Sequence, residues 1–380
     1  MPSASGKVHW IGTGLSTGSG LALLCDRADV TVWGRTAEKA AACLERNGLT
    51  GRAAVGALED LDQAVGAGDV VVSMLPATEH PALVRLALSR GAHFACSSYT
   101  SDEIAAYAPD AVRADVVVLT EAGLDPGIDH ILAHSLVARA RAAVGDGPAQ
   151  AWFTSYCGGV PAEPNDFRYR FSWAPRGVLS ALCSPARSIV DGEATVAARP
   201  WEATAPHVLG GETFEVYPNR DSLPFLAQYA FPAGWRTREF VRGTLRLDGW
   251  RAAWAPVFEV LKTGDGSLID ALAADLAATY PTTAADRDRV VLSVALRVQV
   301  DGGADWSGAY LLDMVGTAAK DGGENAMAKT VSVPLALGVA DILDGRTPPG
   351  LHKALADHAD ADRWLDALRA QGIDCRLIEP

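Results

Sequence analysis

The sequence contains few cysteines, and none of them form the close pairs that metal and disulfide sites use. The six cysteines in 380 residues stand singly, at positions 25, 43, 96, 157, 183 and 375. Zinc sites usually show Cys-x-x-Cys pairs, and disulfide scaffolds pack more cysteines into a shorter chain. We therefore expect no metal centre and no disulfide-based fold.

Long apolar runs and an excess of positive charge are also missing. No stretch reaches the roughly 18 apolar residues of a membrane span, and the first residues, MPSASGKVHWIG, lack the apolar segment of a signal peptide. The formal net charge of −13 disfavours nucleic acid, which binds basic surfaces. We expect a cytoplasmic protein that acts on small molecules and binds neither membranes nor nucleic acid. Any anionic substrate must then meet a local group of arginines.

Short apolar runs alternate with amphipathic stretches in the first third of the chain. At 380 residues, the length favours two domains. A strand–helix alternation in short units predicts a right-handed, doubly wound parallel sheet of the Rossmann type. We assign residues 1–124 to this domain, with strands expected over 8–11, 30–33, 69–74, 92–96 and 116–119.

From about Trp152 the pattern changes to longer polar–apolar alternations. Such alternation predicts a mostly antiparallel sheet with one face solvated or covering a site. We expect a second α/β domain over residues 125–344, with a helical elaboration near 255–285, and residues 345–380 are a candidate to pack back on the first domain. Strands are expected over 168–173, 213–217, 244–247 and 290–300, and helices over 268–280, 326–343 and 351–368.

The sequence Gly12-x-Gly14 lies between the first expected strand and the first expected helix. In that position, glycines let the backbone approach a pyrophosphate at a helix N-terminus. Gly12, Gly14, Leu15 and Ser16 are therefore candidate cofactor residues. The third fingerprint position is Thr17 rather than a small residue, so the match is incomplete and a plain glycine-rich turn remains the alternative.

Two further segments bear on the cofactor. Arg35, Thr36 and Lys39 follow the second strand, where an acidic residue would mark NAD and an arginine accommodates the 2′-phosphate of NADP. We predict NADP(H), with solvated surface residues as the alternative. Leu75 and Pro76 stand at the end of the third expected strand. We expect the tight backbone at this strand end to lie under the nicotinamide ribose. The alternative is a proline that merely stops the strand.

The segment EAGLDPGIDHIL, residues 121–132, comes directly off a buried strand. Ligands of open α/β sheets bind outside the carboxyl ends of the strands. Proline and glycine stiffen the turn and hold Asp125 in one place, as a proton-transfer site requires. The alternative is a helix cap, formed by Asp125 or Asp129.

Several longer motifs occur in order between about residues 7 and 345. They are SSYTS at 97–101, EAGLDPGIDH at 121–130, SYCGGVPAEPNDFRYRFSWAPRGVL at 155–179, FEVYPNRDS at 214–222, VRGTLR at 241–246 and ENAMAKTVSVPLALG at 324–338. Together they resemble the saccharopine reductase family, the NADP-dependent, L-glutamate-forming saccharopine dehydrogenases. The resemblance implies a Rossmann domain joined to an α/β substrate domain. It also implies reductive condensation of L-glutamate with L-2-aminoadipate 6-semialdehyde.

By this resemblance Tyr99, Asp125 and Cys157 line the reaction centre. Forming a secondary amine from an amine and an aldehyde requires proton exchange. We assign acid–base and orienting roles to Asp125 and Tyr99, and a hydrogen-bonding or proton-sharing role to Cys157. The alternatives are a half-buried aromatic side chain for Tyr99 and a small apolar residue for Cys157.

Saccharopine carries three carboxylates, and guanidinium is their natural bidentate partner. The candidate partners are Arg176, Arg220 and Arg242, and each stands in one of the motifs that carry the resemblance. Arg176 could instead face the cofactor phosphates. For any one of the three arginines, the alternative is a surface ion pair. Hydrogen bonds are expected from Ser98, Ser172, Asn219, Ser222 and Thr244.

Two other functions remain as alternatives to saccharopine formation, because the fold alone does not distinguish them. One is a related amino-acid dehydrogenase, such as lysine 6-dehydrogenase, carboxynorspermidine dehydrogenase or an opine-type reductase. Another is a non-catalytic NADP-binding regulator, whose mark would be the loss of proton-transfer groups. A homodimer is expected from the prevalence of twofold oligomers.

Overall fold

The computed structural model describes residues 4–171, 175–303, 305–354 and 358–378. Its contacts divide the chain into two compact units. The first contains Met1–Ile131 and Ala328–Gly372, and the second contains Leu132–Met327 and Ile373–Pro380. This division differs from the expected ranges, because residues 328–344 belong with the first unit.

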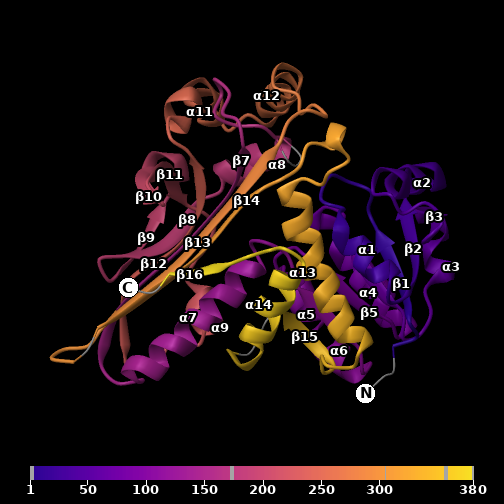
Figure 1. The fold of residues 1–380 in the computed structure, drawn as a ribbon, viewed down its shortest axis with the longest axis horizontal. Coiled ribbons are helices and arrows are strands. Elements are labelled where there is room, and N and C mark those ends of the chain that lie inside the picture. The colour runs from indigo at the N-terminus through magenta and orange to yellow at the C-terminus, as the bar shows by residue number, and fades with distance from the viewer. Residues whose placement is uncertain (1–3, 172–174, 304, 355–357, 379–380) are drawn as a thin grey trace. The chain divides into compact units, whose positions relative to one another are not determined.

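A parallel sheet forms the centre of the first unit (Figure 1). Its seven strands run in the order β15-β6-β5-β4-β1-β2-β3, and every neighbouring pair is parallel. This confirms the predicted Rossmann-type sheet. The strands are β1 (Lys7–Ile11), β2 (Asp29–Gly34), β3 (Ala54–Ala57), β4 (Val70–Ser73), β5 (His93–Cys96), β6 (Val117–Thr120) and β15 (Gly350–Lys353).

Helices cover both faces of this sheet, because its buried strands are apolar on both sides. Trp10 faces α1 and α13 in one apolar cluster, while its neighbour Ile11 packs with α4 in the other. The helices are α1 (Ser19–Cys25), α2 (Ala37–Arg46), α3 (Leu61–Ala64), α4 (His80–Arg90), α5 (Asp102–Ala106), α6 (Ala108–Arg113), α13 (Ala326–Leu343) and α14 (Ala361–Ala370).

The prediction of one helix over residues 351–368 is wrong. Residues 350–353 form β15, which pairs in parallel with β6, and the helical part is α14. Strand β3, at the opposite edge of the sheet, was also not predicted. Its four residues are exposed or half-buried, so they show no apolar run.

Helices α1 and α13 approach each other closely at Gly20. A Cβ atom on Gly20 would lie 2.0 Å from the backbone oxygen of Ser332, and the Gly20 N–H donates to Ser332 Oγ at 3.1 Å. Only glycine fits this contact. By length and composition alone α13 could cross a membrane, which is weak support for a span because the helix is mostly buried.

The second unit is built on a mixed sheet of nine strands, of which seven follow the order β10-β11-β12-β7-β13-β14-β16. All neighbours in this order are antiparallel except β12 and β7, which confirms the predicted mostly antiparallel sheet. The strands are β7 (Ala149–Pro161), β8 (Ala186–Val190), β9 (Glu193–Ala197), β10 (Ala205–Leu209), β11 (Glu212–Pro218), β12 (Trp235–Leu247), β13 (Asp288–Gln299), β14 (Trp306–Val315) and β16 (Arg376–Ile378).

Helices α11 and α12 lie at one end of the long strands β7, β13 and β14 (Figure 1). They enclose an apolar cluster with Trp250 and Trp254 at its centre, and they form the predicted helical elaboration. The helices are α7 (Ile128–Val144), which begins in the first unit, α8 (Pro175–Cys183), α9 (Pro224–Gln228), α10 (Trp250–Ala253), α11 (Ala255–Leu261) and α12 (Gly266–Thr279).

The predicted strand over residues 168–173 is wrong in its described part. Residues 168–171 form no strand, and 172–174, with Ser172, lie outside the described residues. The Asn165 side chain accepts from the Tyr169 N–H at 3.1 Å and donates to the Tyr169 carbonyl at 2.8 Å, which fixes a turn. The aromatic residues Tyr169 and Phe171, two positions apart, resemble the alternation of a strand, but they are apolar because both pack into the aromatic cluster.

Candidate functional site

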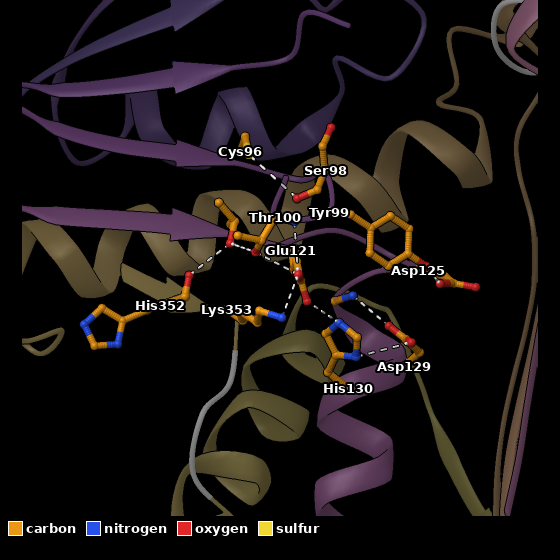
Figure 2. A network of polar contacts seen from close by, with 12 residues as sticks. Cys96, Ser98, Tyr99, Thr100, Glu121, Asp125, Asp129, His130, His352 and Lys353 are labelled. Carbon is orange, nitrogen blue, oxygen red and sulfur yellow. Dashed lines mark hydrogen bonds and ion pairs between the residues drawn. The ribbon is translucent and has the colours of Figure 1, made fainter. Parts of the chain in front are cut away.

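Two loops meet at the carboxyl ends of neighbouring parallel strands in the first unit. The loop after β5 carries Tyr99, and the turn after β6 carries Asp125 (Figure 2). The Tyr99 hydroxyl donates to Asp125 Oδ1 at 2.6 Å, and both side chains are half-buried. The structure thus joins two of the three predicted catalytic residues directly, at the edge of the sheet where ligands of this fold bind.

The turn that carries Asp125 depends on Gly127. The Gly123 N–H donates to the Pro126 carbonyl at 2.9 Å, and Gly127 has φ +146°. A Cβ atom on Gly127 would lie 2.0 Å from the Gly123 oxygen, so no other residue fits. The peptide bond between Asp125 and Pro126 is cis.

Asp129 accepts a backbone hydrogen bond of this turn. Its Oδ1 accepts from the Gly127 N–H at 2.7 Å, at the start of α7. Asp129 therefore has the helix-start role, while Asp125 Oδ1 accepts from a side chain. The proton-transfer role of Asp125 stays a prediction.

A buried carboxylate, Glu121, lies beside the Tyr99 loop, and the sequence analysis did not assign it a role. Its Oε1 accepts from the Thr100 N–H at 3.1 Å and the Thr100 hydroxyl at 2.8 Å, and lies 3.4 Å from Lys353 Nζ. Its Oε2 lies 3.0 Å from His130 Nε2 (Figure 2). Burial opposes ionisation, but His130, Lys353 and the Thr100 N–H outweigh it and lower the pKa of Glu121 well below its usual range.

His80 links the ends of β4 and β5 and was also missed. Its Nδ1 lies 3.0 Å from Ser73 Oγ, and its Nε2 lies 3.0 Å from Ser98 Oγ. The imidazole is 1% exposed, and burial lowers the pKa of His80 to about 4. A neutral imidazole therefore fixes Ser98, a predicted substrate contact, against the strand end expected under the nicotinamide.

The loop between β1 and α1 has the backbone that a dinucleotide requires. Gly12 has φ +122°, and a Cβ atom there would lie 3.0 Å from Met74 Cβ, whereas one on Gly14 would meet nothing within 4 Å. Leu15 is 63% exposed and Ser16 is half-buried. The loop is thus open at Gly14, where a pyrophosphate would lie.

Gly20, three residues after Thr17, permits the close packing of α1 on α13 described above. Leu75 and Pro76 follow β4, with Leu75 half-buried and Pro76 exposed. The Met74 N–H just before them donates to the Ile11 carbonyl at 2.8 Å, which holds this strand end beside the glycine loop.

Exposed basic residues follow β2. Arg35 and Lys39 are exposed, while the Thr36 hydroxyl caps α2 by accepting from the Lys39 N–H at 3.4 Å. Arg46, at the end of α2, donates to the Thr13 carbonyl at 2.8 Å, which places another cation at the glycine loop. The basic side chains of this set suit the 2′-phosphate of NADP, and the carboxylate beside them, Glu38, hydrogen-bonds to Thr36 at the start of α2.

Strand register brings several predicted substrate residues together in the second unit. Cys157 on β7 pairs with Thr244 on β12, and Ser155 pairs with Arg242. Residues two apart on a strand share a face, so these four side chains lie on one face of the sheet. Cys157 and Thr244 are half-buried.

Arg242 is fixed by the segment that follows β11. It is 3% exposed, its guanidinium carbon lies 3.9 Å from the Phe225 ring centroid, and its backbone N–H donates to Ser222 Oγ at 2.9 Å. The Asn219 N–H donates to the Arg242 carbonyl at 2.9 Å. Arg220, exposed and at φ +58°, follows directly. The predicted residues Asn219, Arg220, Ser222 and Arg242 therefore form one local group.

Arg176 stands apart from this group. It lies on α8 in the helical elaboration, where its guanidinium pairs with Asp270 of α12 and donates to Ser180 Oγ at 2.6 Å. The guanidinium of Arg176 is exposed and already has a carboxylate partner, so the structure gives no support to its predicted contact with substrate or cofactor.

Arg246 is a buried arginine that sequence analysis did not single out. It is 8% exposed and lies over three aromatic rings, with its guanidinium carbon 4.9 Å from the Tyr169 centroid and 5.7 Å from those of Tyr217 and Trp250. Glu215 is opposite in register but accepts from the Arg251 N–H at 2.7 Å. Within the described ranges, Arg246 has no carboxylate partner. It shares the sheet face of Arg242 and Thr244.

The cysteines are all free thiols. In the part of the chain that the structure describes, no group of three or more His, Cys, Asp or Glu residues could hold a metal ion.

Family models match both units of the chain. The saccharopine dehydrogenase NADP binding domain matches residues 8–119, and the saccharopine dehydrogenase C-terminal domain matches residues 123–373. Together they cover most of the 380 residues.

Curated relatives extend this similarity over most of both partners. A saccharopine dehydrogenase [NADP(+), L-glutamate-forming] from Pyricularia oryzae is 30% identical, over 83% of this chain and 85% of the relative. The enzyme of the same name from Saccharomyces cerevisiae is 31% identical, over 77% of this chain and 80% of the relative. Among solved structures, the apo L-Glu-forming saccharopine dehydrogenase from Saccharomyces cerevisiae superposes with a TM-score of 0.85 at 27% identity, covering 99% of this chain and all of that one.

Proposed function

Because this chain belongs to the saccharopine dehydrogenase family, we propose that it catalyses the NADPH-dependent condensation of L-glutamate with L-2-aminoadipate 6-semialdehyde to give saccharopine, and the reverse oxidation. The observation that carries the proposal is the hydrogen-bonded Tyr99–Asp125 pair at the strand ends of an NADP-binding fold. A non-catalytic regulator would have no need to keep these proton-transfer groups.

The reaction needs three proton movements, and acid–base groups at the strand ends can serve them. The glutamate amine attacks the aldehyde carbon only when neutral, so its proton must be removed. After the attack a proton must pass from the nitrogen to the oxygen, which gives a hydroxyl group. This hydroxyl must then be protonated to leave as water, which gives a protonated imine. Asp125 is the candidate to exchange these protons, and Tyr99 orients its Oδ1 through the 2.6 Å hydrogen bond.

The first unit contains residues that fit the cofactor. The open loop at Gly14 would hold the pyrophosphate, and Arg35 with Lys39 would meet the 2′-phosphate. When bound, NADPH supplies the hydride that converts the imine carbon to the secondary amine. Leu75 and Pro76, after β4, are assigned to the nicotinamide ribose.

The second unit is assigned the amino-acid carboxylates. Arg220 and Arg242 keep the roles predicted for them, with Asn219, Ser222 and Thr244 as neighbouring donors. Arg246 replaces Arg176 in this assignment, because a buried guanidinium without a carboxylate is stabilised when an anionic substrate pairs with it. Cys157, across from Thr244 in register, is assigned a hydrogen-bonding role.

A kinetic comparison of two arginine variants tests the carboxylate assignment. We expect Arg246→Met to raise the KM for saccharopine at least about tenfold, the loss of one charged hydrogen bond, with the KM for NADP⁺ unchanged. Arg176→Met is the matched control and is expected to leave both constants near wild type. The reverse ranking of the two variants would restore Arg176 and remove Arg246.

A substrate panel separates this proposal from its alternatives. Reduction of NADP⁺ would be followed with saccharopine, lysine and carboxynorspermidine, and then with NAD⁺. We expect activity with saccharopine and NADP⁺. Activity with lysine or carboxynorspermidine alone would assign the chain to that related dehydrogenase, and silence with every substrate would favour a regulator.

We propose further that the protein is a cytoplasmic homodimer. The support for the dimer is the prevalence of twofold oligomers. Light scattering on the purified protein tests the dimer, and a monomeric mass would overturn it. Fractionation of the source cells tests the location.

A further inference from the structure

Glu121 connects the two loops whose residues form the Tyr99–Asp125 pair. One connection is direct, since the Tyr99 hydroxyl donates to Asp125 at 2.6 Å. The other passes through Glu121, which accepts two hydrogen bonds from Thr100, the residue after Tyr99. Figure 2 shows both connections lying beside each other at the ends of β5 and β6.

The second connection continues from Glu121 to the Asp125 turn. His130 lies 3.0 Å from Glu121 Oε2 through Nε2 and 3.4 Å from Asp129 Oδ2 through Nδ1. Asp129 in turn accepts from the Gly127 N–H at 2.7 Å, two residues after Asp125. The Tyr99 loop and the Asp125 turn are therefore tied together twice, once by their reactive side chains and once by a chain of buried acid and imidazole groups.

The burial of this chain makes its geometry specific. Glu121 is 1% exposed, Asp129 and His130 are fully buried, and Glu121 has a left-handed backbone at φ +58°. A buried carboxylate is tolerated only when its oxygens are matched by donors or cations in good geometry. Here Lys353 from β15 adds a cation 3.4 Å from Oε1. Such a group holds its neighbours in one arrangement, as preorganisation of a reactive pair requires.

We propose that Glu121 is a positioning residue for the reaction, which acts by holding the Tyr99 loop against the Asp125 turn through Thr100 on one side and His130–Asp129 on the other. Glu121 does not exchange protons with the substrate in this account. The proposal rests on the function proposed above, in which Tyr99 and Asp125 are the reactive pair.

Kinetics of Glu121→Gln test the proposal. Gln keeps the size and an acceptor oxygen for Thr100, but it removes the negative charge that faces Lys353 and presents an amide donor where the carboxylate accepts. We expect kcat to fall at least about tenfold, as a small misplacement of reacting groups does, with the KM for NADPH within about twofold of wild type. Glu103→Gln, at an exposed ion pair with Arg85 in the same unit, is the matched control and should show neither change.

A double-mutant cycle tells positioning from general damage. If Glu121 acts through Tyr99, Glu121→Gln in a Tyr99→Phe background should lower kcat by less than about twofold, because coupled residues are not additive. Full multiplication of the two losses, or wild-type kcat in Glu121→Gln, would overturn the proposal. Should Glu121→Gln fail to fold, Thr100→Val takes its place with the same expected outcomes. This variant removes the hydroxyl contacts with Glu121 and Thr120 and keeps the Thr100 N–H.

A readout without turnover separates this inference from the proposed reaction. Protein labelled with 3-fluorotyrosine would be compared by ¹⁹F NMR, with the Tyr99 signal assigned from Tyr99→Phe. We expect Glu121→Gln to move or broaden that signal while Glu103→Gln does not. An unmoved signal contradicts the inference even if saccharopine is turned over, and a moved signal supports it even if the substrate is another amino acid.

Discussion

The hydroxyl of Tyr99 and the carboxylate of Asp125 form a 2.6 Å hydrogen bond between two loops that are 26 residues apart in sequence. The loops meet because β5 and β6 are parallel neighbours whose carboxyl ends lie at the same edge of the sheet. A carboxylate oriented by a phenol at this edge can serve as an acid–base group for imine chemistry.

Removing either member of this pair should affect turnover more than cofactor binding. We expect Tyr99→Phe and Asp125→Asn each to lower kcat about a hundredfold, the usual contribution of a positioned acid–base group. NADPH affinity, measured by fluorescence titration, should stay within about twofold, since neither side chain is assigned to the cofactor. Wild-type turnover in both variants would remove the assigned roles.

Buried His80 should make the fold sensitive to acid. Its pKa is lowered by burial to about 4, against an ordinary value of 6.5 in the unfolded chain. Between pH 6.5 and about pH 4, His80 is protonated in the unfolded chain but neutral in the folded protein. The free energy of unfolding therefore falls as the pH falls through this range. The full loss is roughly 3 kcal/mol below pH 4.

Urea titrations of wild type and His80→Gln at pH 7 and pH 5 measure this term. The variant keeps hydrogen-bonding groups between Ser73 and Ser98 but cannot titrate. It should therefore lose less stability than wild type on acidification. Equal losses in both proteins would show that His80 does not hold a lowered pKa.

Arg35 should distinguish the two nicotinamide cofactors. We expect Arg35→Ala to raise the KM for NADPH at least about tenfold, the loss of a charged hydrogen bond to phosphate, and to change the KM for NADH little. Arg90→Ala, at a surface ion pair with Asp62, is the control. A wild-type preference for NADH of tenfold or more would contradict the NADP assignment.

The contact of Gly20 with α13 should be intolerant of a methyl group. Because a Cβ there would lie 2.0 Å from the Ser332 oxygen, Gly20→Ala should destabilise the fold by about 1–3 kcal/mol, as overpacking does. Gly147→Ala, where a Cβ meets nothing within 4 Å, should leave the urea midpoint unchanged. Equal midpoints for both variants would show that α1 and α13 can move apart freely.

The parallel sheet could be predicted because each buried strand is a short apolar run. Residues 30–33 and 116–119 show this pattern, and both belong to strands that are paired on both sides, β2 and β6. Strand β15 could not be found in this way. It pairs with β6 across more than 200 residues, and no local signal records such a distant partner.

The candidate site was predictable where function follows from position at a strand end, as for Tyr99 and Asp125. Glu121 and His80 were missed because their roles depend on partners scattered along the chain, such as Thr100, Lys353 and Ser98. The surroundings of Arg176 and Arg246 could not be predicted for a related reason. Only the fold reveals which guanidinium already has a carboxylate beside it.

The measurement that tests the central claim most directly is the transfer of a labelled hydride. Purified protein would be supplied with L-glutamate, L-2-aminoadipate 6-semialdehyde and NADPH deuterated at the transferable position, and the product identified by mass spectrometry. We predict saccharopine carrying one deuterium, formed in proportion to the NADPH consumed. Consumption of NADPH without saccharopine, or no reaction with this pair of substrates, would contradict the account.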